Sequence, residues 1–166
     1  MLKRATEVEH DGHWPADQAV GRVTLAYDDR HRRRLKLRTE SGTDFLLDLG
    51  RAALLRDGDG LRLEDGGWIA VAAAPEDVVD VRGGTPRATA RLAWHLGNRH
   101  LPVQILDDGA IRFRYDHVIE DMVIGLGGKA ERKSAPFTPE GGAYSEGSAH
   151  GHDYAHHHHH HGHEHD

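Results

Sequence analysis

The chain has 166 residues, no cysteine and 16 histidines, and its formal net charge is −6. The absence of cysteine excludes disulfide scaffolds, thiolate zinc sites, iron–sulfur clusters and cysteine nucleophiles. The acidic charge argues against a nucleic-acid partner, and the longest apolar run is too short to cross a membrane.

Residues 21–74 show the pattern of a small all-β domain. Apolar and polar residues alternate over short segments such as 22–27 and 34–38, and Asp-Gly or Gly-Gly pairs separate many of them. Short strands at near-regular spacing, with tight turns between them, are typical of a sandwich or barrel. A turn is expected at residues 28–30 and a short helical turn at 52–56. We therefore predict a β-rich N-terminal domain over residues 1–75.

Residues 76–136 predict a second domain with two helices. A strand over 76–82 is followed by a helix that Thr85 caps and that begins with Pro86. Strands around 103–105 and 111–115 flank an Asp-Gly turn, Asp116 caps a second helix, and a polar segment at 129–135 is the last strand. The order strand–helix–strand–strand–helix–strand is that of a ferredoxin-like domain, so the predicted class is α+β.

The remaining residues predict no folded domain. Residues 137–149 are rich in proline, glycine and serine, which indicates a flexible linker. The last 17 residues, 150–166, hold ten of the 16 histidines, and so polar a segment is expected to be disordered.

The histidine-rich tail is the first candidate metal site. Neutral imidazole is a ligand for nickel, copper, zinc and iron. Six consecutive histidines are also the pattern of an affinity tag, but further histidines interleave with Gly, Asp and Glu on both sides of the run, which favours a native tail. The predicted tail ligands are His150, His152, His156, His157, His158, His159, His160, His161, His163 and His165.

Two segments of the second domain carry further candidate ligands. His95 and His100 lie near the end of the first predicted helix, where a histidine also complements the helix dipole without any metal. His117 lies in the first turn of the second helix, and Glu120 or Asp121 could orient its ring. Those two acids could equally well only complement the dipole of a helix that Asp116 caps, so spacing alone leaves both interpretations open.

The run of basic residues over 30–34 is interpreted as a solvated turn or a protein-docking edge. No aromatic residues interleave it, unlike a nucleic-acid surface, and the chain as a whole is acidic. No nucleophile elbow, P-loop or dinucleotide-binding fingerprint is present. The N-terminus lacks the apolar stretch of a signal peptide, so we expect a cytoplasmic location.

The segments "HLGNRHLPVQ" (95–104) and "DHVIEDMVIGLG" (116–127) resemble the two signature stretches of the UreE family of urease accessory proteins, which are nickel metallochaperones. The resemblance extends over essentially the whole chain and is weakest in the first 20 residues. It implies a homodimer formed through the second domain, with His100 as the nickel ligand at the dimer interface and His117 as a secondary ligand. Some relatives have a histidine where this chain has Tyr115. The N-terminal domain resembles a peptide-binding module.

The resulting hypothesis is a non-enzymatic chaperone that captures Ni(II) and delivers it for urease maturation. The implied partners are the accessory GTPase UreG and the urease apoprotein complex, and Zn(II) or Cu(II) could replace nickel in vitro. The alternatives are a metal storage or detoxification protein that acts through its tail, and a peptide-binding adaptor whose dimerisation the metal controls. A metal-dependent hydrolase is disfavoured because it needs a fixed ligand set and a general base in a pocket.

Overall fold

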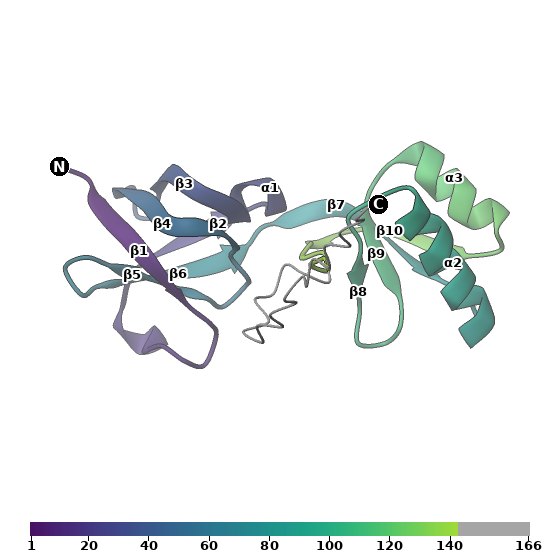
Figure 1. Cartoon of the computed structure of the whole chain (residues 1–166), viewed down its shortest axis with the longest axis horizontal. Helices are drawn as coiled ribbons and strands as arrows, with labels where there is room; N and C mark the ends of the chain where they lie inside the picture. Colours follow the sequence, from purple (N-terminus) through teal and green to yellow (C-terminus); the bar gives the residue numbers. More distant parts are fainter. Residues whose placement is uncertain (143–166) are drawn as a thin grey trace, which may run out of the picture.

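The computed structural model describes residues 1–142, which form two β-sheets with separate hydrophobic cores (Figure 1). Two sheets and few helices confirm the expected α+β class. The expected tail and the linker residues from 143 onward lie outside the described residues. Within residues 1–142, no helix is long and apolar enough to span a membrane.

The first sheet contains six strands in the order β2-β6-β5-β1-β4-β3. Its pairs are antiparallel except for the parallel pairs β1 with β4 and β2 with β6. A 3-10 helix, η1 (Ala16–Gln18), precedes β2, and a single helical turn, α1 (Tyr27–Arg30), replaces the expected turn at 28–30. The strands are β1 (Lys3–Glu9), β2 (Ala19–Leu25), β3 (His31–Arg38), β4 (Asp44–Leu54), β5 (Gly60–Leu63) and β6 (Trp68–Ala73).

Two features of this sheet differ from the expectations. Strand β1 was not predicted, because its residues are mostly polar and only Ala5 is fully buried; it is nevertheless a central strand between β4 and β5. The expectation of a helical turn at 52–56 is wrong, because Ala53 and Leu54 pair with Arg32 and His31 of β3 and so extend β4. In both places pairing with a neighbouring strand decides the conformation.

The second sheet contains four strands in the order β10-β7-β9-β8, and every neighbouring pair is antiparallel. The Thr85 hydroxyl accepts the backbone N–H of Ala88 at 3.1 Å, and the Asp116 carboxylate accepts from Val118 and Ile119, so both expected helix caps are confirmed. The elements in chain order are β7 (Pro75–Arg82), α2 (Pro86–Asn98), β8 (Gln104–Ile105), β9 (Ile111–Arg114), α3 (His117–Gly125) and β10 (Lys129–Pro136).

Helices α2 and α3 cover one face of this sheet, on the side away from the first sheet (Figure 1). Alternate residues of β7 and β9 point toward the helices, as the strand period of two requires. Burying this layer of aliphatic side chains contributes about 1.5–3 kcal/mol per large residue. The buried members of this core are Val79, Val81, Leu92, Leu96, Ile111, Phe113, Ile119 and Val123.

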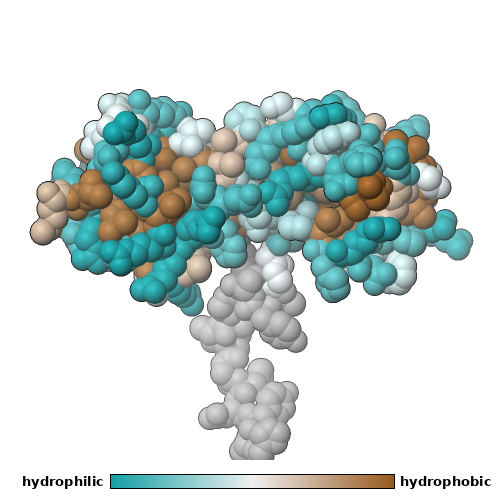
Figure 2. All heavy atoms as spheres, turned by 90° about the horizontal axis from the view of Figure 1, so that it is seen from above, coloured by the Kyte–Doolittle hydropathy of each residue, from teal (hydrophilic) through white to brown (hydrophobic). Residues whose placement is uncertain are grey.

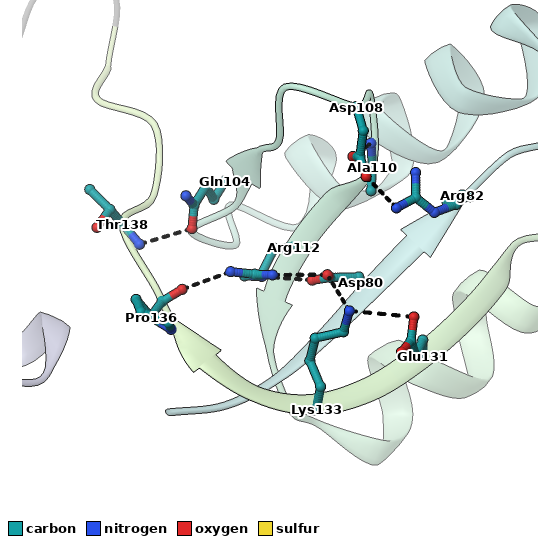
Figure 3. Close-up of polar contacts among 10 residues, drawn as sticks. All are labelled: Asp80, Arg82, Gln104, Asp108, Ala110, Arg112, Glu131, Lys133, Pro136 and Thr138. Atoms are coloured by element: carbon teal, nitrogen blue, oxygen red, sulfur yellow. Dashed lines mark hydrogen bonds and ion pairs between the residues drawn. The ribbon is translucent and has the colours of Figure 1, made fainter. Parts of the chain in front are cut away.

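The opposite face of the same sheet carries a charged network around Asp80 (Figure 3). Asp80 is only 3% exposed, and Arg112 donates to both of its carboxylate oxygens, at 2.7 and 2.9 Å. Lys133 lies 3.3 Å from the same carboxylate, and Arg112 also donates to the carbonyl of Pro136. Burial by itself favours the neutral acid, but these two cations outweigh it, so the pKa of Asp80 lies below its ordinary range.

Arg30 joins the two sheets. Its side chain is fully buried, so the interpretation of the basic run at 30–34 as a solvated turn or a protein-docking edge is wrong for Arg30; residues 32–34 are exposed, but they belong to β3 and not to a turn. Nε donates to the carbonyl of Leu25 at 3.1 Å, and Nη1 donates to the carbonyl of Leu55 and the hydroxyl of Thr138, both at 3.1 Å. Nη2 donates to the carbonyl of Phe137. One guanidinium thus binds three separate segments.

Further contacts surround this junction. Arg114 of β9 donates to both carboxylate oxygens of Asp28 at 3.1 Å, and its guanidinium lies over the rings of Tyr27 and Phe137, 5.5 and 5.8 Å from their centroids. The backbone N–H of Tyr27 donates to the carboxylate of Glu76 at 2.9 Å. The junction therefore combines an ion pair, cation–π contacts and a hydrogen bond from a backbone N–H to a carboxylate.

Residues 137–140, where the linker was expected to begin, are part of this fold. Phe137 is fully buried, and the backbone N–H of Thr138 donates to the side-chain oxygen of Gln104 at 3.0 Å. Glu140 donates its backbone N–H to the carbonyl of Val103 at 2.7 Å, and its carboxylate accepts from Ile105. The burial of the Phe137 ring helps to hold this segment on the fold, although the composition of the segment predicted a linker.

We predict that Arg30→Met lowers the free energy of unfolding by about 3 kcal/mol or more, because each buried acceptor left without a donor costs about 1–3 kcal/mol. Urea denaturation followed by circular dichroism measures the change. The matched control is Arg34→Met, since Arg34 is 65% exposed and lies 4.0 Å from its nearest carboxylate. An equal, small effect of both substitutions would show that the guanidinium does not stabilise the junction.

Candidate metal centre

His100 lies in the turn that follows α2. Its backbone N–H donates to the carbonyl of Gly97 at 3.0 Å, and that of Arg99 donates to Leu96 at 3.2 Å, so the turn satisfies the last carbonyls of the helix. The φ of His100 is +55°, and it is the one non-glycine residue with positive φ in the part of the chain that the structure describes. Leu101 packs against the core immediately afterwards. The exposed imidazole therefore projects from a turn whose backbone is held by hydrogen bonds and by the packing of Leu101.

His95 lies in the last turn of α2 and is half-buried. Its ring meets that of Trp94 edge to face, with centroids 4.9 Å apart. This position also suits a histidine that complements the negative end of the helix dipole. Nothing in this geometry brings His95 and His100 into a common metal site.

His117 is the first residue of α3 and is exposed. Asp116 caps the helix, whereas neither Glu120 nor Asp121 forms a side-chain hydrogen bond with His117 within residues 1–142. Glu120 thus lies in the first turn as a partner of the helix dipole, and neither acid orients the ring. Tyr115, just before the cap, is covered by the guanidinium of Arg132, which lies 3.5 Å from the ring centroid.

Across residues 1–142, no group of three or more histidine or acidic side chains is arranged to hold a metal ion. His100 and His117 are each exposed on the helical layer, at the end of one helix and the start of the other. A metal ion at His100 therefore needs additional ligands from water, from another copy of the chain or from residues beyond 142. The ten predicted tail ligands all lie outside the described residues.

An apolar surface accompanies these histidines on the helical layer. Trp94 of α2 is 64% exposed, and Val118 and Ile124 of α3 are each 52% exposed. Figure 2 shows apolar atoms at the surface of the half of the molecule that contains these helices. Both helices of this layer therefore expose apolar side chains.

We predict that position 100 tolerates glycine better than valine. His100→Val should lower the free energy of unfolding by about 1–2 kcal/mol, because a branched side chain is strained at positive φ, whereas His100→Gly should leave it unchanged or raise it. Thermal denaturation of the two variants measures the difference. Arg99, with φ of −90°, is the control. At Arg99, glycine should destabilise the protein more than valine does. If valine were better tolerated than glycine at both positions, the backbone of His100 would not be strained.

Comparisons with known proteins identify the family on both halves of the chain. The UreE urease accessory protein N-terminal domain matches residues 1–74, and the UreE urease accessory protein C-terminal domain matches residues 76–166. The matched families are those of an accessory protein, so the expectation that the chain is not an enzyme is confirmed.

Individual relatives agree with this assignment. The urease accessory protein UreE of Rhodopseudomonas palustris (strain HaA2) is 55% identical over 150 residues, which cover 89% of this chain and 69% of the relative. That of Bradyrhizobium sp. (strain ORS 278) is 54% identical over 149 residues, 89% of this chain and 70% of the relative. That of Ruegeria pomeroyi is 46% identical over 151 residues, 91% of this chain and 97% of the relative. The chain belongs to the UreE family of urease accessory proteins.

Proposed function

We propose that the protein is a nickel metallochaperone that captures Ni(II) at His100 in a homodimer and delivers it for maturation of the urease active site. The observation that carries the proposal is the exposed His100 imidazole on the hydrogen-bonded turn that follows α2, in a chain of the UreE family. Imidazole is a suitable ligand for nickel, and copper or zinc can compete for it in vitro.

The number of ligands that one chain offers supports a dimer. One chain offers a single His100, and residues 1–142 contain no cluster that would complete a metal site. A two-fold axis near this turn would bring two His100 imidazoles together, and the exposed Trp94, Val118 and Ile124 would be buried between the copies. A site with few protein ligands leaves coordination positions for a receiving protein, which delivery requires. His117 is proposed as a secondary ligand near this site.

The His-rich tail is proposed to load the dimer site. A tethered segment raises the local concentration of the ions that it binds, without any fixed geometry of its own. The ten histidines of the tail lie between His150 and His165. Residues 137–149 are proposed to connect the tail to the second domain. The first of them, 137–140, pack on the folded part of the chain.

The two sheets support a division of tasks. We assign the metal and dimer functions to a ferredoxin-like domain at 76–136, whose order of elements and sheet order support this class. Docking of partners is assigned to the β-rich domain at 1–75. The partners in this proposal are the GTPase UreG and the urease apoprotein complex, in the cytoplasm.

The second candidate function is storage or detoxification of nickel, zinc or copper. The feature that favours it is the tail itself, since ten histidines in 17 residues exceed what a single transfer site requires. Growth under excess nickel, with and without residues 150–166, separates the two functions, because a storage protein loses protection with its tail while a delivery protein chiefly loses urease activation.

We predict that His100→Asn abolishes the tight nickel site at the dimer interface. Asparagine tolerates positive φ and lacks the imidazole, so the turn is retained while the ligand is lost. Isothermal titration calorimetry with protein that lacks residues 150–166 measures the site without the tail. The control is His95→Asn, which removes the neighbouring histidine of α2. An unchanged tight isotherm in His100→Asn would refute the site.

We also predict that removal of residues 150–166 lowers the nickel stoichiometry but leaves one tight site per dimer. Different imidazoles bind the tail ions and the interface ion, so removal of the tail should not remove the interface site. Equilibrium dialysis followed by metal analysis gives both numbers, and light scattering verifies that the dimer remains. Equal stoichiometry with and without the tail would refute a metal-binding tail.

A further inference from the structure

A hollow of about 510 Å³ lies on the first sheet where the pairing of β3 with β4 is interrupted. Arg34 pairs with Asp48 and Arg32 pairs with Ala53, so Arg33 lies opposite residues 49–52. Such a bulge bends the strand and redirects its side chains. We call this place the bulge hollow. The described residues that line it are Thr6, Val8, His10, Leu49, Gly50, Arg51, Ala53 and Leu54.

Part of the lining of the bulge hollow is apolar and accessible. Val8 and Ala53 pack against the core of the first sheet but are only partly buried, and Leu54 is half-buried. Gly50 is exposed, and a Cβ built on it would meet no atom within 4 Å in the described part of the chain. An apolar side chain of a partner that entered the hollow would therefore leave water, which contributes about 25 cal/mol for each Å² buried.

Three arginines at the bulge form no ion pair within the described part of the chain. Arg32 donates to a backbone carbonyl of α1 at 3.0 Å, and Arg33 donates to the carbonyl of Leu49 at 3.2 Å. Arg51 is exposed and has no side-chain hydrogen bond there. All three lie at the hollow, because Arg51 lines it and because Leu49 and Ala53, which contact Arg33 and Arg32, line it too.

The remaining cations of β3 are neutralised, unlike those at the bulge. Lys36 and Arg38 both pair with Asp44, at 2.9 and 2.6 Å. None of the described residues that line the bulge hollow is acidic. Charges along an edge strand such as β3 can serve only to prevent pairing with another sheet. That explanation does not extend to Arg51, which belongs to β4, the inner neighbour of β3.

We propose that the bulge hollow is the docking site for an acidic segment of a partner protein. An apolar side chain of that segment contacts Val8, Ala53 and Leu54, and carboxylates on either side of it bind the arginines. A guanidinium is suited to this role because it binds a carboxylate through two parallel hydrogen bonds. A nucleic acid fits less well, since no Trp, Tyr or Phe is among the described lining residues to stack on a base. The inference rests on the docking role proposed above for residues 1–75.

The test measures binding of a fluorescein-labelled acidic peptide, in which one leucine stands between two Asp-Glu pairs, to the full-length protein by fluorescence anisotropy. Arg51→Glu should weaken binding about tenfold or more, because a cation at the site is replaced by a charge that repels the peptide. Arg87→Glu, the same charge change at an exposed position of α2, is the matched control and should bind as the natural chain does. A peptide with Asn and Gln in place of the acids should bind at least tenfold more weakly.

A second pair of variants tests the hollow without a change of charge. Gly50→Trp fills it and should also weaken binding about tenfold, whereas Gly50→Ala adds one methyl group in open space and should leave binding unchanged. Circular dichroism verifies that each variant is folded, and Arg51→Glu tests the site independently if Gly50→Trp is not.

Equal binding of the acidic and the neutral peptide, or an equal loss in Arg51→Glu and Arg87→Glu, would overturn the inference. A single-stranded thymidine oligonucleotide that displaces the peptide at a lower concentration than unlabelled peptide does would also overturn it, in favour of a nucleic acid. Nickel titration of the same proteins keeps the two proposals apart. Arg51→Glu should bind nickel as the natural chain does, and a natural chain that binds no nickel would refute only the metallochaperone function.

Discussion

The guanidinium of Arg30 is buried between the two sheets and donates to carbonyls at the end of β2, just after β4 and just after β10. Burial lowers the pKa of Arg30, and the charges of Glu76 and Asp57 oppose that shift. A guanidinium remains protonated even so, and its donors in a planar fork can bind several acceptors at once. This side chain holds the carbonyl of Phe137, together with the hydrogen bonds that Thr138 and Glu140 form with Gln104 and Val103.

This junction separates two regions with different chemistry. The helical layer, which His100 follows in the chain, lies on the side of the second sheet away from the first sheet (Figure 1). A groove lined by His10, His31 and residues 139–142 lies beside the first sheet. Between them, the charged network of Asp80 and Arg112 fills the sheet face opposite the helices. His31 and His117 are the first residues of β3 and α3, whereas His10 and His100 lie just beyond the ends of β1 and α2.

Local sequence rules were sufficient to predict most of the helices and strands of the second domain. The caps at Thr85 and Asp116 follow from side chains that accept the first free N–H groups of a helix, and the apolar spacing of Leu92 and Leu96 follows from the helical period. The same rules located His100 just after a helix and His117 in the first turn of another. They could not reveal the positive φ of His100, since histidine has no strong preference for that conformation.

The sequence by itself determined the order of elements in the second domain, the histidine-rich end and the family of the chain, because these depend on short-range pattern and composition. Only the tertiary structure decided that the polar β1 is a central strand, that β4 continues to Leu54, that Arg30 is buried among its charged neighbours, and that His10 and His31 line one groove with residues 139–142. Each of these depends on partners far away in the chain: a strand needs a neighbour for its hydrogen bonds, and a buried charge needs acceptors from several segments.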